Sequence, residues 1–205
     1  MSANEFKEFN NEVLGYLQQN NLENMISEPS SFRVIFTYMV EAIVNSLLYG
    51  LFIGILLITL IIGLFFRSYL LPALSIFPNI LPIGMGFGLW GLFVGDVGFM
   101  VAVGMGSTLG VIVDFTVHFL SKYELARKEF KKSVEESVIY SFETVGFALI
   151  IMTVVLALGF SVLNLVTFIP IQDFAKFSVI CFIGGLIINF LFLPNLLIKF
   201  DKRKF

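Results

Sequence analysis

Residues Ser46–Phe66 read SLLYGLFIGILLITLIIGLFF, an apolar run without a charged side chain. A helix needs about 20 predominantly apolar residues to cross the hydrocarbon core of a bilayer. Strands of a membrane β-barrel are shorter and alternate apolar with polar residues, and this run does neither. It therefore predicts a transmembrane helix, and the rest of the chain repeats the pattern.

Four further stretches are also long enough to span a bilayer and predominantly apolar, which predicts an all-α membrane protein with five transmembrane helices. The loops between them are short, except for a polar stretch at 121–142. Within it, Ser121–Tyr140 mixes acidic and basic residues at helical spacing, which predicts a solvated amphipathic helix. The expected spans are Ser46–Phe66, Leu70–Val94, Gly98–Phe119, Thr144–Leu165 and Phe174–Ile198.

The composition fits a surface that faces lipid. Hydrophobic residues make up 58% of the 205 residues and charged residues 14%, whereas soluble domains carry about 25% charged residues. The net charge of −2 leaves no basic face for a phosphate backbone, which excludes nucleic-acid binding. Cys181 is the single cysteine and lies in an apolar run, so disulfide frameworks and cysteine-based metal sites are excluded.

Lysine and arginine fall unevenly on the two sides of the five spans. Three of them, Lys7, Arg33 and Lys176, lie on one side, and ten lie on the other. Basic residues collect on the cytoplasmic side of membrane proteins. We therefore expect an outside N-terminus, a cytoplasmic C-terminus and a location in the cytoplasmic (inner) membrane. The ten are Arg67, Lys122, Arg127, Lys128, Lys131, Lys132, Lys199, Lys202, Arg203 and Lys204.

The N-terminal segment 1–30 is polar and has no signal-peptide pattern. Its apolar residues recur at helical spacing, which predicts an amphipathic helix. Such a helix either packs on a domain outside this sequence or lies on the membrane surface. We expect 1–30, which Pro29 closes, to be an extracytoplasmic tail and 31–205 to be the five-helix transmembrane domain. The recurring apolar residues are Phe6, Phe9, Val13 and Leu17.

The third span, GFMVAVGMGSTLGVIVDFTVHF at 98–119, carries ionisable residues. Ser107, Asp114 and His118 share one helical face in it. A carboxylate near the centre of a span costs at least about 2.5–3.5 kcal/mol, so we expect Asp114 to face the bundle interior and find a partner there. Asp114 and His118, four residues apart, can share a proton or a hydrogen bond.

These three residues form a candidate proton relay, and each also has a structural interpretation. Asp114 can instead hold a neighbouring helix through a hydrogen bond, and His118 can anchor the span at the membrane interface. Ser107 is either a relay hydroxyl or a packing residue.

The fourth span adds candidate supporting residues. Glu143 and Thr144 open it, where the helix macrodipole also favours an acidic side chain. Thr153 lies deeper and can hydrogen-bond across to the third span. The sequence has no phosphate-binding loop and no metal-ligand cluster. Ser107 and His118 lie about 16 Å apart along one helix axis, too far for a nucleophilic triad, so we expect neither an enzyme nor a cofactor or metal site.

Glycines predict close helix packing. Gly106 and Gly110 form a small-xxx-small pair in the third span, which lets helix backbones approach. Gly84 and Gly88 in the second span lie beyond two prolines that kink the helix. A kinked, glycine-lined helix also suits a moving transporter core.

Several of these stretches resemble the resistance-nodulation-division (RND) exporters, and the nearest branch is the MmpL-like, hydrophobe or lipid exporter group. The resemblance covers nearly the whole chain from about Phe32, and its third-span stretch is fairly specific. It rests on Arg67-Ser68, Pro78-Asn79-Ile80-Leu81-Pro82, Gly110-Val-Ile-Val-Asp114-Phe-Thr-Val-His118-Phe119, Glu143-Thr144-Val-Gly146, Thr153, Leu158-Gly159-Phe160 and Leu193-Pro194.

The resemblance implies a module of a proton-driven exporter, in which Asp114 belongs to the proton relay and the proton gradient replaces a cofactor. It implies that 1–30 ends a porter-type domain and that 31–205 is the C-terminal five-helix part of one half. Its partners would be membrane lipids, a hydrophobic substrate and the remainder of the transporter, in the same or a separate chain. Phe115 stands where many relatives have Tyr, so one relay hydroxyl is missing. We expect a fragment, a split subunit or a truncated relic.

Two other functions stay open. Sterol-sensing domains of the same superfamily also comprise five helices, so a sterol- or lipid-sensing domain without transport activity is the alternative. In that case Asp114 is structural, and lipid binds between helices near the glycine-rich second span. A structural partner subunit with no ion or ligand of its own is the third hypothesis.

Overall fold

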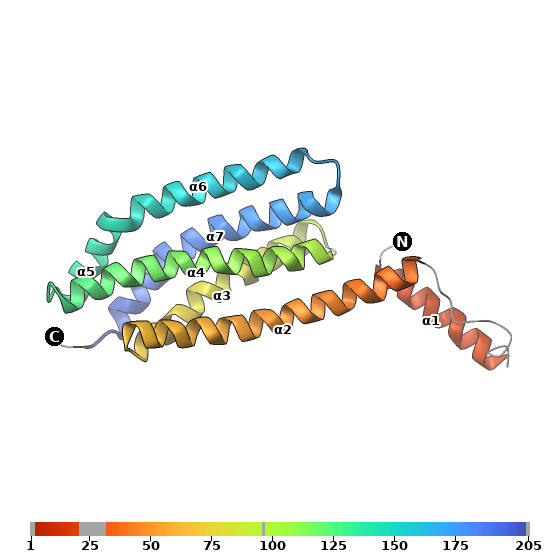
Figure 1. The fold of residues 1–205 in the computed structure, drawn as a ribbon, viewed down its shortest axis with the longest axis horizontal. Helices are drawn as coiled ribbons and strands as arrows, with labels where there is room; N and C mark the ends of the chain where they lie inside the picture. Colours follow the sequence, from red (N-terminus) through yellow and green to blue (C-terminus); the bar gives the residue numbers. More distant parts are fainter. Residues whose placement is uncertain (1–2, 21–31, 96, 204–205) are drawn as a thin grey trace. The chain divides into compact units, whose positions relative to one another are not determined.

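The computed structural model describes residues 3–20, 32–95 and 97–203, and every regular element in these ranges is a helix. The chain divides into two compact units, Met1–Ser46 and Leu47–Phe205. The α-helices are α1 (Ala3–Gln19), α2 (Phe32–Phe66), α3 (Leu70–Phe93), α4 (Phe99–Lys128), α5 (Val134–Ser141), α6 (Phe147–Val162) and α7 (Ile169–Phe200) (Figure 1). A π-helical turn, Phe142–Gly146, joins α5 to α6, and a 3₁₀ turn, Leu163–Leu165, follows α6.

Five helical segments of the described chain are long and apolar enough to cross a membrane, which confirms the predicted number of spans. Their bounds extend beyond several of the predicted ones because polar residues at the helix ends continue the helices. The segments are Tyr38–Phe66, Leu70–Phe93, Phe99–Lys128, Val134–Leu165 and Ile169–Phe200.

The prediction of a solvated amphipathic helix at Ser121–Tyr140 is wrong. Instead, α4 continues through Lys128 and buries Leu120, Tyr123 and Ala126 completely. A turn follows, and α5 then begins at a capping box in which the Ser133 hydroxyl accepts from the Glu136 N–H and the Glu136 carboxylate accepts from the Ser133 N–H. The π turn carries α5 into α6 without a break.

The N-terminal unit contains α1, which confirms the predicted amphipathic helix. Phe9 and Val13 are exposed on it. What covers this face, a further domain or a membrane surface, therefore stays a prediction. The side chain of Phe6, the residue Pro29 and the domain boundary predicted at residue 30 lie outside the described residues.

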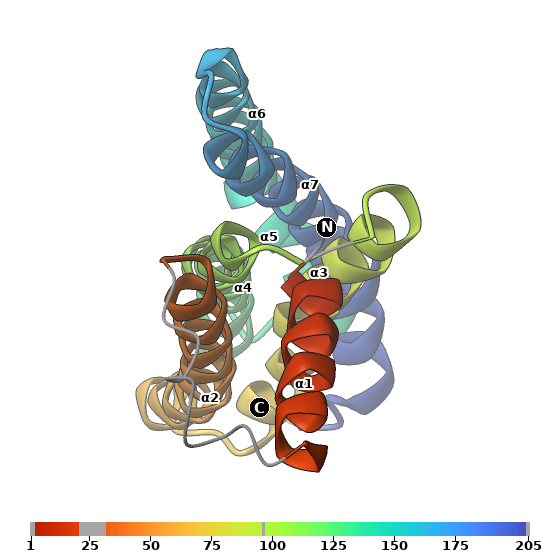
Figure 2. The same cartoon turned by 90° about the vertical axis from the view of Figure 1, so that its right-hand side faces the viewer.

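The unit 47–205 is built around α7, which packs against α3, α4 and α6. Seen nearly along the helices, α6 lies at one edge of this unit, α2 at the other, and α4 at the side between them (Figure 2). In each of α3, α4 and α7, half or more of an apolar 18-residue stretch is buried within the described chain. The buried share is 22% for such a stretch in the α5–α6 segment and 6% in α2. The outer helices therefore leave most of their surface uncovered by the rest of the described chain.

The close helix contacts use other glycines than those predicted. A Cβ on Gly86 of α3 would lie 2.7 Å from the sulfur of Cys181, and one on Gly185 of α7 would lie 3.0 Å from Ile112. A Cβ on any of the four predicted packing glycines would meet nothing within 4 Å in the described chain: Gly84, Gly88, Gly106 and Gly110. These four glycines lie on the outer sides of α3 and α4, so they make no close helix contact within the described chain and their packing role stays a prediction.

Basic residues predicted to share one side meet at one end of this unit, called the basic end below. The Lys128 ammonium donates to the carbonyl oxygen of Phe66, the last residue of α2, at 3.0 Å. The Arg203 guanidinium, beyond α7, donates to both oxygens of Glu124 in α4, at 3.0 and 2.9 Å. The ends of α2, α4 and α7 thus lie together, as an alternation of spans requires. The side of a membrane that this end faces stays a prediction.

Candidate functional site

The candidate relay residues all lie on the exposed side of α4. Ser107, Asp114 and His118 are exposed, although the Ser107 hydroxyl donates to the carbonyl oxygen of Gly104 in its own helix at 3.0 Å. In the described part of the chain, neither the Asp114 carboxylate nor the His118 imidazole has a hydrogen bond or an ion pair with another side chain. We call this side, made by Gly106, Ser107, Gly110, Asp114 and His118, the polar face of α4.

The prediction that Asp114 points into the bundle is therefore wrong for this chain. The opposite side of α4 is the one that packs, and Ile112, Phe115, Thr116 and Phe119 are completely buried there. In a helix, residues at i and i+4 share a side, so Asp114 and His118 turn outward together when Ile112 and Thr116 turn inward. The helical period predicts which residues share a side of the helix, but it does not predict which neighbouring helix that side faces.

A buried polar cluster joins α3, α4 and α7, and sequence reasoning missed it. The Thr116 oxygen lies 2.7 Å from Oδ1 of Asn79 in α3 and 2.8 Å from Oδ1 of Asn189 in α7. All three side chains are almost or fully buried. The Asn189 amide donates to the carbonyl oxygen of Gly185 at 3.0 Å, which directs its Oδ1 towards Thr116.

One hydroxyl carries one proton, so Thr116 donates to one of the two asparagines. The arrangement that satisfies every group has the Asn79 amide turned to donate N–H to Thr116, which then donates to Asn189. Asparagines within apolar spans were the available signal, because polar groups inside a membrane segment normally find partners. The cluster stabilises the contact of three helices, and none of its members is ionisable.

The candidate supporting residues are not joined to Asp114 by any described hydrogen bond. The Thr153 hydroxyl is buried but donates to the carbonyl oxygen of Leu149 in its own helix at 2.8 Å. The predicted bond from Thr153 to the third span is therefore wrong. Glu143 and Thr144 are exposed on the π turn, and Thr144 donates to the carbonyl oxygen of Tyr140. Single π turns within α-helices are frequent at functional sites.

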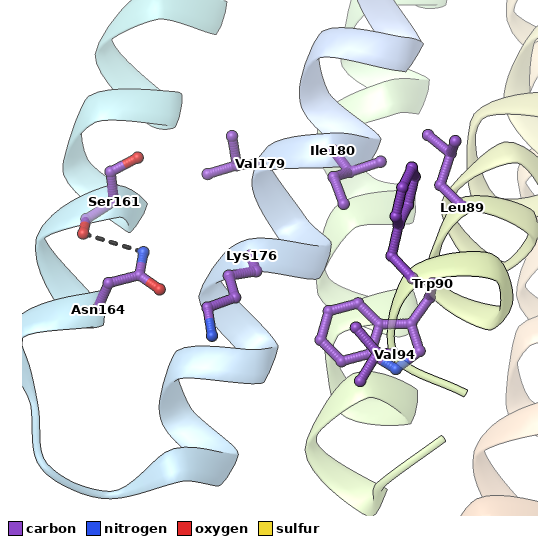
Figure 3. A pocket seen from close by; sticks show the side chains of 9 residues that line it. Leu89, Trp90, Val94, Ser161, Asn164, Lys176, Val179 and Ile180 are labelled. Carbon is purple, nitrogen blue, oxygen red and sulfur yellow. Dashed lines mark hydrogen bonds between the residues drawn. The ribbon is translucent and has the colours of Figure 1, made fainter. Parts of the chain in front are cut away.

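A cavity of about 390 Å³ opens between α3, α7 and the end of α6, at the end of the unit opposite the basic end. Figure 3 shows Ser161, Asn164 and Lys176 on one side of it and Leu89 and Trp90 on the other. The Asn164 amide donates to the carbonyl oxygen of Ser161 at 3.1 Å, whereas its Oδ1 is buried and has no hydrogen-bond donor among the described residues. A molecule with an apolar body and a hydrogen-bond donor could pack against Leu89 and Trp90 and donate to the Oδ1 of Asn164.

A second hollow lies between α2 and α3 at the basic end, with a volume of about 650 Å³. We call it the α2–α3 groove. Its lining residues are Leu56, Thr59, Leu60, Gly63, Leu64, Arg67, Ser68, Tyr69, Pro72, Ala73 and Ile76.

The described residues contain no group of three His, Cys, Asp or Glu side chains that could hold a metal ion. No protein-family model and no curated protein matches this chain.

Proposed function

We propose that this chain is the transmembrane module of a proton-coupled, RND-type exporter of lipids or hydrophobic compounds in the cytoplasmic membrane. It would act with the remainder of the transporter, in the same or a separate chain. The observation that supports this proposal is the polar face of α4. A carboxylate and an imidazole lie one turn apart on the outer side of a membrane-spanning helix, beside glycines with open space above them.

The free-energy cost of a charged side chain in lipid favours an arrangement in which a second protein surface covers this face. A charged side chain in contact with lipid costs several kcal/mol, and such groups normally face other helices or a water-filled cavity. Gly106 and Gly110 leave room for another helix to approach α4 closely. The face therefore fits the joint between this bundle and the rest of a transporter.

The chemistry of the face fits proton transfer. Protonation of Asp114 removes a negative charge from the joint, and His118 lies within reach as donor or acceptor of that proton. A charge that appears and disappears at a helix contact biases how the two bundles pack, which is how proton movement can drive a conformational change. Ser107, about two turns away from Asp114, would extend the path along the same side.

The variant Asp114→Asn tests this proposal when the substitution is made in the full protein that the cell produces and transport is measured in the native membrane. Efflux of a hydrophobic fluorescent compound and the accompanying proton uptake should both be lost, because the amide cannot carry a proton. The amount of protein in the membrane should be unchanged, since Asp114 makes no contact that holds this bundle. Asp173→Asn, a matched change near the start of α7, should leave efflux intact, and full efflux by the Asp114 variant would contradict the proposal.

The cavity in Figure 3 favours one second function, a lipid-sensing domain without transport activity. It lies beside the second span, where the sequence led us to expect lipid. Photo-crosslinking of a lipid analogue to Trp90 or Val179 that persists in the Asp114→Asn variant, without any efflux by the wild type, would support the sensor over the exporter.

A further inference from the structure

The α2–α3 groove has an apolar floor and a polar mouth. Leucines of α2 and the side chains of Pro72, Ala73 and Ile76 line its length. The hydroxyl of Thr59 is already satisfied, because it donates to the carbonyl oxygen of Ile55 at 2.7 Å. Arg67, Ser68 and Tyr69 lie together between the end of α2 and the start of α3. The groove therefore fits an apolar chain along its floor and a polar group at its mouth.

The backbone at the mouth is unusual for an arginine. Arg67 has φ +50°, and the Ser68 N–H donates to the carbonyl oxygen of Gly63 at 3.3 Å. This is the Schellman ending of a helix, in which the residue after the cap is left-handed and usually glycine. A side chain there strains the backbone, because its Cβ comes too close to the following carbonyl oxygen. Burial in a core does not explain an arginine at this strained position, because Arg67 is exposed at the mouth of the groove.

The mouth is electrically positive. No acidic side chain pairs with Arg67 in the described residues. The nearby Lys128 has an acidic partner, because its ammonium lies 2.8 Å from the Glu124 carboxylate, which also accepts from Arg203. Tyr69 is 99% exposed, which suits a tyrosine at the level of lipid headgroups. A guanidinium on its own is a strong and often bidentate ligand for phosphate.

We propose that the α2–α3 groove binds one acidic phospholipid, with an acyl chain along the floor and the phosphate at Arg67. Ser68 and Tyr69 offer hydroxyl donors to the same headgroup. The anionic charge is what distinguishes this lipid from bulk zwitterionic lipid, since Arg67 is the unneutralised cation of the mouth. This inference does not depend on transport, because the groove is lined by α2, α3 and the turn between them, whereas the proposed proton relay lies on α4.

The test measures thermal unfolding of the full chain in detergent, with phosphatidylglycerol or phosphatidylcholine added. We expect phosphatidylglycerol to raise the melting temperature more than phosphatidylcholine does. Arg67→Gly should abolish this difference while melting at or above the wild-type temperature without lipid, because glycine relieves the left-handed backbone. A lost lipid effect is thereby separated from a lost fold. Lys199→Ala, a cation of the basic end outside the groove, should respond like the wild type.

Two further measurements test which kind of molecule binds in the groove. Ala73→Phe fills the floor and should remove the stabilisation by phosphatidylglycerol, because the acyl chain loses its place. Glycerol phosphate, which has the anion without a chain, should not stabilise the wild type. Equal effects of the two lipids on the wild type, a retained difference in Arg67→Gly, or stabilisation by glycerol phosphate alone would each overturn the proposal.

Discussion

The Thr116 hydroxyl holds asparagines of two other helices within the buried core, and we expect it to contribute strongly to stability. Thr116→Val keeps the shape of the side chain but leaves Asn79 and Asn189 without their shared partner. A buried polar group that loses its hydrogen bond costs about 1–3 kcal/mol. Denaturation of the purified protein in mixed micelles should show a loss of this order.

Thr153→Val is the matched control for this residue. Thr153 is equally buried, but its hydroxyl bonds only to the carbonyl oxygen of Leu149 in its own helix among the described contacts. The carbonyl keeps its helical hydrogen bond when the hydroxyl is removed, so the cost should be small. Equal losses in the two variants would mean that the cluster adds nothing beyond ordinary packing.

At the scale of elements, side chains of the residues that follow α7 form hydrogen bonds with the end of α4. Asp201 is 4% exposed and accepts from the Tyr123 hydroxyl at 2.6 Å and from Arg203 at 2.8–3.0 Å. Burial alone would raise the pKa of Asp201, but the hydrogen bonds from Arg203 and Tyr123 outweigh it and lower this pKa from 3.8 to about 2. The carboxylate is therefore ionised at every pH that a cell meets.

A lowered folded-state pKa stabilises the protein above the unfolded-state pKa, and this contribution is lost as the pH falls through the folded-state value. The wild-type melting temperature should thus fall between about pH 4 and pH 2, with a loss of about 2 kcal/mol. Asp201→Asn should be less stable at neutral pH and lack this acid step. A titration of melting temperature checks this, with Asp173→Asn as control, and an unchanged acid step in Asp201→Asn would contradict the assignment.

The same elements show what the sequence could and could not predict. Apolar length was enough to find five spans, because it is a property of each segment alone. The buried extension of α4 was missed, because Glu124 and Arg127 look solvated until Asp201 and Arg203 neutralise them from far along the chain. The outward turn of Asp114 was missed for a related reason, since it depends on which neighbours α4 packs against.

At the scale of the whole molecule, the polar face of α4 should be a joint with another bundle rather than a surface in lipid. Gly110→Leu tests this, because a side chain at Gly110 meets nothing within this chain. Leucine also favours a helix over glycine by up to about 1 kcal/mol, so the bundle itself should not be weakened. The added side chain should instead hold the second bundle away from α4.

Gly159→Leu on α6 provides the matched control, since a Cβ there also meets nothing within 4 Å and its side of α6 carries no ionisable group. On native gels of gently solubilised membranes, we expect the wild type to run as a larger assembly and the Gly110 variant to lose it. Where the second bundle belongs to the same polypeptide, we expect the variant to be less compact than the wild type. The Gly159 variant should keep both. If the two variants behave alike, the polar face is open to lipid, and the proton-relay proposal loses the surface on which it depends.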